Sequence, residues 1–324
     1  NLYIDRSGTN YVGLFGYVES GGTVSDVSLT GVNVSGSNGV GGLVGWNYGT
    51  VSDSSVSGSV SGSTDVGGLM GVFNGAAVRN SSSSASVTSR ETPTEESPGS
   101  ISRVGGLIGS AKGDVVDVSA SGSVSGADIV GGLLGDYYGG NLSNATASGD
   151  VDGNNAVGGL VGDTSANIRN SSATGDVSAT ESYVGGLVGR VADGGGSPPS
   201  IKDSDASGEV TVTGGSGFTS AEYIGGLVGA VARGSVTDSH ASGQVTLVAG
   251  GDSGTFAKVG GLIGSFGGPG LASSDFDGTL SNSSASGDVI GPQTVGGLVG
   301  VSAGTITDSD ASGDVTGNGD GSLG

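Results

Sequence analysis

Val40-Gly-Gly-Leu-Val-Gly45 is the stretch that decides the fold, because the chain repeats it along its whole length. The pattern Val/Ile-Gly-Gly-Leu-x-Gly occurs nine times, and Val12-Gly-Leu-Phe-Gly16 is a variant of it. The central leucines are Leu14, Leu43, Leu69, Leu107, Leu133, Leu160, Leu187, Leu227, Leu262 and Leu298. Neighbouring leucines lie 26 to 40 residues apart, and the recurring spacing is 26 or 27. Such periodicity indicates one repeat domain over residues 1–324.

A second pattern lies between the hexapeptides and reads apolar-x-Asp/Asn, followed by Ala/Val-x-Gly-x-Val, as in residues 51–60. After Asp53, alternate positions hold Ser54, Val56, Gly58 and Val60, which is the period-2 alternation of a strand. The alternation fails across the Asp/Asn itself. We therefore expect a bend there, and three short strands per repeat: one before the bend, one after it and one formed by the hexapeptide.

Gly, Ser, Thr and Val dominate the chain, and no helical stripe of apolar residues is present. One such unit cannot bury a core, whereas stacked units can. The sequence therefore predicts an all-β fold, a right-handed parallel β-solenoid of about ten to eleven coils, with right-handed crossovers and a length of roughly 50 Å. The small residues Ala and Gly at inward positions predict a thin interior in which two sheets approach closely.

Composition excludes several classes of protein. The 324 residues include 31 acidic and 10 basic side chains, for a net charge of −21, which argues against a nucleic-acid partner. This acidic balance is typical of proteins that work in concentrated salt. No apolar run approaches the roughly 20 residues of a membrane span, and the absence of Cys removes disulfides and thiol chemistry. We expect no cofactor and no metal site.

The nine hexapeptides resemble the GLUG-motif family, whose repeats occur in large secreted or surface proteins of bacteria and archaea, including adhesin-like proteins. The resemblance covers residues 12 to about 317. It implies an extracellular solenoid, and it supplies no catalytic residue and no ligand.

Six N-x-Ser/Thr sequons are candidate glycosylation sites: Asn33, Asn80, Asn141, Asn144, Asn170 and Asn282. Four of them occupy the bend position that other coils fill with Asp. The structural alternative is that a short acceptor side chain at this corner hydrogen-bonds the backbone of the turn.

A second row of acids follows the Gly of the second strand: Asp150, Asp176, Glu209, Asp288 and Asp314. Neighbouring coils would hold these carboxylates about 5 Å apart, close to the separation in retaining glycosidases. Their surroundings are uniform, so a solvated acidic face is favoured over a polysaccharide-cleaving site, and a divalent cation bridging the row is a minor option. His240 is expected at the surface.

Aromatic residues concentrate in the first half of the chain, after the hexapeptides, and six of them could face a ligand: Tyr17, Trp46, Tyr48, Phe73, Tyr137 and Tyr138. The alternative is that they cover the rim of a thin core. Insertions fall before hexapeptides, at 88–103, 211–223 and 246–258, or after them, at 190–200 and 265–279.

Together these features predict a non-enzymatic, extracellular structural or adhesive element of the cell surface. It would be a stalk segment that continues into a longer surface protein, or a subunit that associates end to end into a filament. Glycans or cell-surface proteins are the expected partners. The rival hypothesis is a carbohydrate-binding or polysaccharide-active solenoid that uses the carboxylate row and the aromatic corner.

Overall fold

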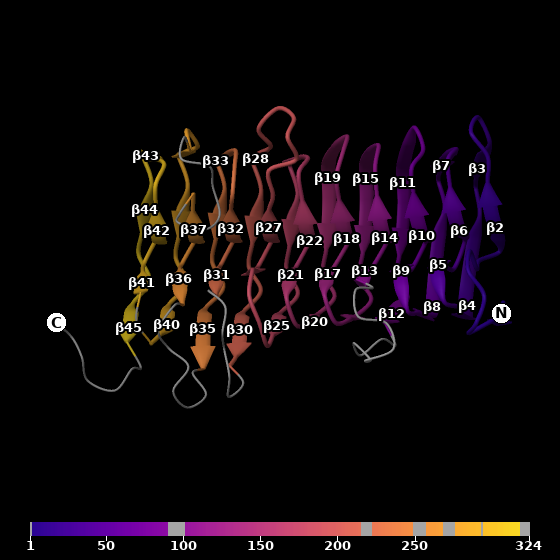
Figure 1. Cartoon of the computed structure of the whole chain (residues 1–324), viewed down its shortest axis with the longest axis horizontal. Helices are drawn as coiled ribbons and strands as arrows, with labels where there is room; N and C mark the ends of the chain where they lie inside the picture. The colour runs from indigo at the N-terminus through magenta and orange to yellow at the C-terminus, as the bar shows by residue number, and fades with distance from the viewer. Residues whose placement is uncertain are drawn as a thin grey trace.

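The computed structural model describes residues 2–89, 101–214, 222–248, 257–267, 276–292 and 294–317. It is a rod of stacked coils with the first and last described strands at opposite ends (Figure 1). Every strand pairs in parallel with its equivalent one coil away, as Val130 does with Val157. This is the parallel β-solenoid predicted from the repeats. Insertion residues 90–100, 215–221, 249–256 and 268–275 lie outside the described residues.

Three sheets run the length of the rod. Within the described residues, sheet A has 26 strands, and all of them lie outside the hexapeptides. Its strands are β1 (Tyr3–Asp5), β3 (Thr23–Ser25), β4 (Ser28–Ser35), β7 (Thr50–Ser52), β8 (Ser55–Gly62), β11 (Ala77–Ser83), β12 (Ser86–Ser89), β15 (Asp114–Ala120), β16 (Val124–Ser125), β19 (Asn141–Ala147), β20 (Val151–Gly153), β23 (Asn167–Arg169), β24 (Ser172–Ala173), β25 (Val177–Ala179), β28 (Ser200–Lys202), β29 (Asp205–Ala206), β30 (Val210–Thr213), β33 (Ser235–Thr237), β34 (His240–Ala241), β35 (Val245–Val248), β38 (Thr279–Ser281), β39 (Ser284–Ala285), β40 (Val289–Gly291), β43 (Thr305–Thr307), β44 (Asp310–Ala311) and β45 (Val315–Gly317).

Sheets B and C share the hexapeptides. Sheet B has nine strands: β5 (Asn38–Gly41), β9 (Thr64–Gly67), β13 (Arg103–Gly105), β17 (Ile129–Gly131), β21 (Ala156–Gly158), β26 (Val184–Gly185), β31 (Tyr223–Gly225), β36 (Lys258–Gly260) and β41 (Thr294–Gly296). Sheet C has ten: β2 (Phe15–Val18), β6 (Val44–Asn47), β10 (Met70–Phe73), β14 (Ile108–Ala111), β18 (Leu134–Tyr137), β22 (Val161–Thr164), β27 (Val188–Val191), β32 (Val228–Val231), β37 (Ile263–Phe266) and β42 (Val299–Ser302).

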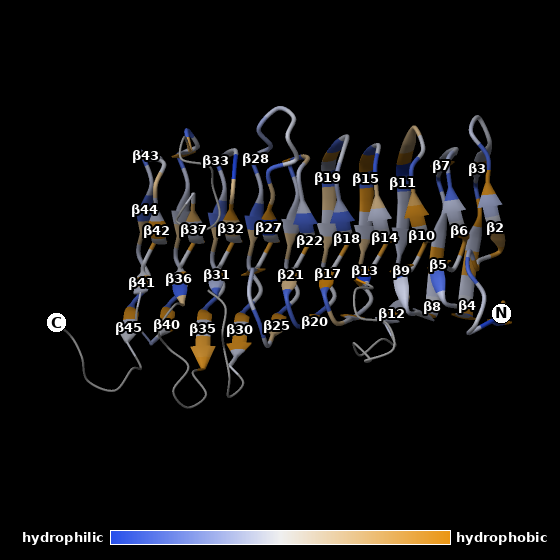
Figure 2. Ribbon diagram, viewed as in Figure 1, coloured by the Kyte–Doolittle hydropathy of each residue, from blue (hydrophilic) through white to orange (hydrophobic). Residues whose placement is uncertain are grey.

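The hexapeptide is therefore two strands, and the expectation of a single strand was wrong. In the fifth coil, β17 ends at Gly131, the chain turns through Gly132 and Leu133, and β18 begins at Leu134. The turn carries the chain from sheet B to sheet C, and the Leu133 side chain is fully buried at it. Hydrophobic segments consequently recur in short strands from one end of the rod to the other (Figure 2).

The interior is thin because glycine backbones pack where side chains would not fit. A Cβ on Gly132 would lie 2.1 Å from the carbonyl oxygen of Gly159 in the next coil and 3.2 Å from the Cβ of Ala147. A Cβ on Gly135 in sheet C would lie 2.7 Å from the backbone nitrogen of Val104 in sheet B. The separations of 2.1 and 2.7 Å are shorter than a real Cβ tolerates, which confirms the close approach of the sheets and explains why the nine exact copies keep their glycines.

Candidate functional site

The bend before each second strand is confirmed, and its cause is backbone conformation. The residue at this position has a φ between 46° and 59° in all ten coils: Asp26, Asp53, Asn80, Asp117, Asn144, Asn170, Asp203, Asp238, Asn282 and Asp308. Asn and Asp adopt this left-handed conformation more readily than other residues with a side chain. We call these residues the bend row.

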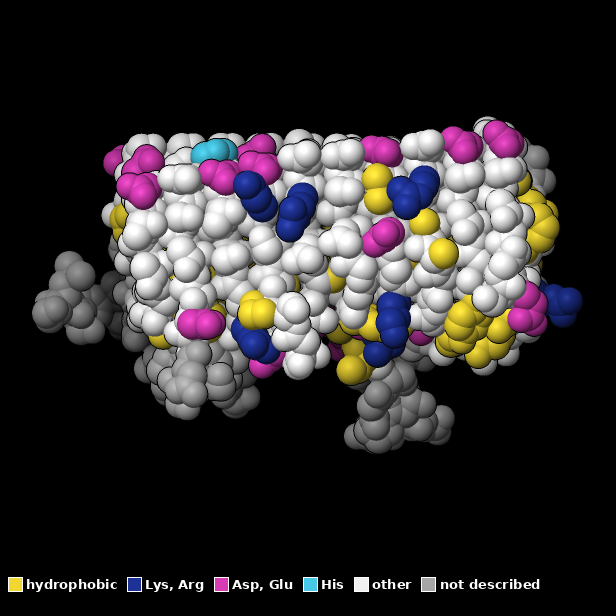
Figure 3. Space-filling model, turned by 90° about the horizontal axis from the view of Figure 1, so that it is seen from above, with side chains coloured by type: hydrophobic (Ala, Val, Ile, Leu, Met, Phe, Trp, Pro, Cys, Tyr) yellow, Lys and Arg dark blue, Asp and Glu magenta, His cyan; other side chains and the backbone are white. Residues whose placement is uncertain are grey.

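Four neighbouring pairs of the bend row are joined by side-chain hydrogen bonds, and no backbone N–H of the described residues donates to a bend-row side chain, so the expected role as backbone acceptors was wrong. Asn144 Nδ2 donates to Asp117 Oδ1 at 2.8 Å, and Asn80 Nδ2 donates to Asp53 Oδ1 at 3.1 Å. An amide on one coil thus satisfies a carboxylate on the previous coil. Acidic side chains recur along one long edge of the rod (Figure 3).

The backbone of the turn is satisfied by a serine that the sequence analysis did not single out. Ser204 Oγ donates to Lys202 O at 2.8 Å and accepts the backbone N–H of Ser171, on the previous coil, at 3.3 Å. Directly after the bend residue, the same pair of bonds is made by Ser54, Ser81, Ser171, Ser204, Ser239, Ser283 and Ser309. The Asp/Asn-Ser dipeptide is the signal that could have revealed it.

All six sequon asparagines are exposed. Asn80, Asn144, Asn170 and Asn282 stand in the bend row, Asn33 lies in β4, and Asn141 opens β19. Asn141 Nδ2 also reaches across a coil boundary, to Asp114 Oδ1 at 3.3 Å. Exposure is compatible with glycosylation, which stays a prediction.

The second acidic row has a structural task. Asp150 Oδ1 accepts the backbone N–H of Asp176 at 3.1 Å, Asp176 Oδ1 accepts that of Glu209 at 2.9 Å, and Asp288 Oδ1 accepts that of Asp314 at 2.9 Å. Each of these three carboxylates thus accepts a backbone N–H of the next coil at a point where sheet A is interrupted between two strands. This shared use gives no member of the row the distinct environment that an acid and a nucleophile need.

His240 is exposed on β34, as expected, and its Nδ1 lies 2.9 Å from Ser284 Oγ. Within the described residues, no three His, Cys, Asp or Glu side chains are grouped so that they could hold a metal ion.

Residues that differ in type from coil to coil form a line along the surface where sheets B and C meet. The sequence analysis did not predict this line. We call it the seam; it is formed by the residues directly before and directly after the hexapeptides. Arg103 Nη1 lies 3.3 Å from Asp65 Oδ1, and Arg103 Nε lies 3.1 Å from Asp136 Oδ2. Farther along, Arg190 pairs with Asp163 through Nε at 3.0 Å and also through Nη2. The hexapeptide flanks differ from coil to coil, so no repeat pattern marks the seam.

Burial dominates the electrostatics of the seam. It raises the pKa of Asp136 to about 6, an effect that the neighbouring Asp163 reinforces and Arg103 opposes. Burial also raises the pKa of Asp65 against the effect of Arg103, and that of Asp163 against the effect of Arg190. Beside the seam, next to Lys258, burial raises the pKa of Glu222 to about 7, and Lys258 opposes this shift.

The six candidate aromatic residues divide into two groups. Phe73 and Tyr137 are fully buried in sheet C, so the expectation that they face a ligand was wrong for these two. Both side chains point into the rod from the last residue of their sheet C strands. Tyr137 Oη donates to the carbonyl of Gly113 at 3.1 Å. Tyr17, Trp46, Tyr48 and Tyr138 reach the surface. The ring centroids of Trp46 and Tyr48 are 6.1 Å apart, and those of Tyr17 and Tyr48 are 5.8 Å apart.

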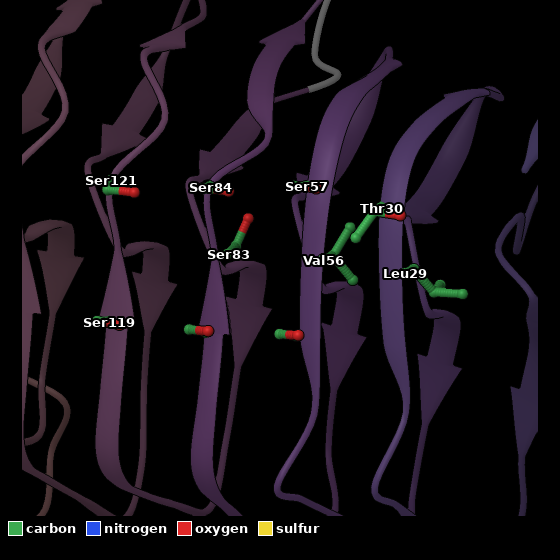
Figure 4. A pocket seen from close by; sticks show the side chains of 10 residues that line it. Leu29, Thr30, Val56, Ser57, Ser83, Ser84, Ser119 and Ser121 are labelled. Atoms are coloured by element: carbon green, nitrogen blue, oxygen red, sulfur yellow. The ribbon is translucent and has the colours of Figure 1, made fainter. Parts of the chain in front are cut away.

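The described surface of the rod includes the two following hollows. One, of about 330 Å³, lies on sheet A over four coils and is lined almost entirely by hydroxyl-bearing side chains (Figure 4). The other, of about 410 Å³, lies at the corner that follows sheet C. The residues that line this corner hollow are Tyr48, Asn74, Gly75, Lys112, Gly113, Gly139 and Gly140.

Fold and surface together define an acidic repeat protein of the β-solenoid class. The GLUG motif matches residues 36–61, 153–178, 180–213, 220–246 and 291–316. Each matched segment begins shortly before a hexapeptide. These five matches across the chain support its assignment as a GLUG-repeat protein.

The chain is also similar to halomucin of Haloquadratum walsbyi (strain DSM 16790 / HBSQ001), with 39% identity over 59 residues. The alignment covers 18% of this chain and 1% of halomucin. No solved structure matches. The described part of the chain contains no helix with the length and hydrophobicity of a membrane-spanning segment. The repeats and the similarity fit a surface-associated, structural repeat protein.

Proposed function

We propose that this chain is a non-enzymatic, extracellular rod that serves as a structural and adhesive element of a cell surface. The observation that carries the proposal is the commitment of its repeated polar side chains to the rod itself. Carboxylates of the second acidic row accept backbone N–H groups of the next coil, and amides of the bend row bond to carboxylates of the previous coil. A surface built this way maintains a shape and leaves few groups for chemistry.

Location is tested by immunogold labelling of the producing cells with antibodies against the rod. Label at the outer surface or in the surrounding matrix supports the proposal, and label confined to the cell interior contradicts it.

The enzymatic alternative is tested by measuring release of reducing ends from acidic and neutral polysaccharides. We expect no turnover. Turnover that disappears in Asp176→Asn would replace the proposal, because Asp176 belongs to the second acidic row, whose carboxylates are exposed and repeat at coil spacing.

Two forms of the rod satisfy the proposal: a stalk segment in a longer surface protein, and a subunit in a head-to-tail filament. In the second form, β2 of one copy would pair with β42 of the next, since these are the outermost strands of sheet C. Sedimentation over a wide concentration range distinguishes them: a length distribution that grows with concentration favours the filament, and a discrete monomer excludes it.

A further inference from the structure

The corner hollow is built by the absence of side chains. A Cβ on Gly75 would lie 2.0 Å from the carbonyl oxygen of Gly49, and one on Gly113 would lie 2.4 Å from that of Gly75. A Cβ on Gly140 would lie 2.3 Å from the carbonyl oxygen of Gly113. The floor is therefore bare backbone over several coils, and side chains from its neighbours form its walls.

Aromatic rings stand beside this floor. Tyr48 lines the hollow and is 37% exposed, and through Tyr17 and Trp46 it continues into the aromatic cluster toward the N-terminal end. Tyr138 is 41% exposed, and its hydroxyl donates to Asn74 Oδ1 at 2.7 Å. That bond fixes the Asn74 amide and leaves its Nδ2 hydrogens as donors at the hollow. Exposed rings of this kind present flat apolar faces with a polar edge.

The corner hollow also contains a cationic side chain, that of Lys112. Lys112 lines the hollow and is exposed, and among the described residues no carboxylate oxygen lies within 4 Å of its ammonium group. This is notable in a chain with 31 acidic and 10 basic side chains, where Arg103 and Arg190 are held in ion pairs. The Lys112 side chain extends past Gly139, whose missing Cβ would lie 3.3 Å from Lys112 Cγ.

We infer that the corner hollow binds an acidic oligosaccharide. Tyr48 stacks on the apolar face of a sugar ring, the Asn74 amide donates to its hydroxyl groups, and Lys112 pairs with a carboxylate of a uronate unit. The bare floor lets the chain of sugars approach the backbone. This inference deepens the adhesive part of the proposed function and rests on it, because it supplies the chemical class of the adhesive ligand.

Calorimetric titration with a linear galacturonate hexamer, and with maltohexaose as the neutral control, tests the inference. The titrations use 1 M NaCl, where the Debye length is about 3 Å, so that the net negative charge of the rod is screened at long range while a direct contact persists. We expect the acidic hexamer to bind about fivefold more tightly than the neutral one.

Matched variants locate the site. Lys112→Gln should abolish the preference for the acidic hexamer, and Arg169→Gln, which removes the same charge from an exposed position on sheet A, should keep it. Tyr48→Ala should weaken both hexamers about tenfold, whereas Tyr3→Ala, 71% exposed on β1, should weaken neither. Unchanged melting temperatures of the Lys112 and Tyr48 variants show that any loss is local.

Three results would overturn the inference: no binding of either hexamer at millimolar concentration, equal effects of Lys112→Gln and Arg169→Gln, or binding of a hexaglutamate peptide that equals the acidic sugar and is insensitive to Tyr48→Ala. The last would reassign the hollow to acidic peptides. A rod that labels the cell surface yet binds neither hexamer would remove this site and leave the structural proposal standing.

Discussion

The hexapeptide interior and the bend row solve the same problem, the joining of one coil to the next, by opposite means. In the interior, Gly132 and its equivalents allow backbones to touch because they have no side chain. At the bend row, Asn144 and Asp117 join coils through side chains that project into solvent. The first solution is steric and admits one residue, whereas the second is polar and admits exchange of Asn with Asp. The repeats vary accordingly. The nine exact hexapeptides keep their glycines, whereas the bend row holds Asp in some coils and Asn in others.

The largest effect should come from adding one methyl group to the interior. Gly132→Ala places a Cβ against the Gly159 carbonyl and should lower the free energy of unfolding by about 2–3 kcal/mol. Gly196→Ala, whose Cβ would meet no atom within 4 Å, is the control and should change it by less than about 0.5 kcal/mol. Thermal melts of the two variants check this, and equal melting would disprove the steric account.

The seam offers an intermediate case, since its side chains are polar like the bend row and buried like the interior. Arg190→Gln leaves the Asp163 carboxylate, 8% exposed, without its cation. Because the Arg190 side chain is itself 37% exposed, we expect a loss of about 2 kcal/mol in denaturant unfolding. Arg169→Gln, an exposed change of the same charge, should have little effect. Similar losses of stability in both variants would show that the ion pair of the seam contributes no more than an exposed charge does.

Buried serines directly after the bend row also join neighbouring coils through polar contacts. Ser204→Ala leaves the backbone N–H of Ser171 unpaired inside the rod, and we expect a cost of about 1–2 kcal/mol. Ser207→Ala, at an exposed position in the same coil, is the matched control. Hydrogen exchange of the Ser171 amide should accelerate in the first variant alone; an unchanged rate would show that water replaces the hydroxyl.

The smallest effect is the response to pH. The folded-state pKa of Asp136, about 6, lies above its ordinary value, so its contribution to stability is fully present below pH 4 and is lost as pH rises through 6. The melting temperature should therefore rise from pH 8 to pH 5, and Asp136→Asn should reduce this rise. Asp176→Asn should leave it intact. A wild-type melting temperature that falls over the same interval would contradict the sign.

Much of the architecture could be predicted from the sequence because it depends on period. The spacing of the leucines predicted parallel coils, and the failure of alternation at Asp53 predicted the bend, since both signals recur in every unit. The division of the hexapeptide could not be predicted, because Gly-Gly-Leu fits a strand and a turn equally well in local terms. The seam and the corner hollow depend on which unlike residues become neighbours across coils. Arg103 and Asp136 are 33 residues apart and belong to no shared motif, so only the stacked structure brings them together.

The pairing of every coil with its own equivalent also bears on how such proteins change over generations. Each strand pairing between coils joins the same positions, as Val130 joins Val157 and Val157 joins Val184, so the backbone faces of any coil are interchangeable with those of its neighbours. Unequal recombination between repeats in the gene would insert or delete whole coils while leaving the parallel backbone pairing of the remaining coils of the same kind. The reach of the rod is thereby a heritable quantity that changes in steps of about 4.8 Å, independently of whatever its corners display.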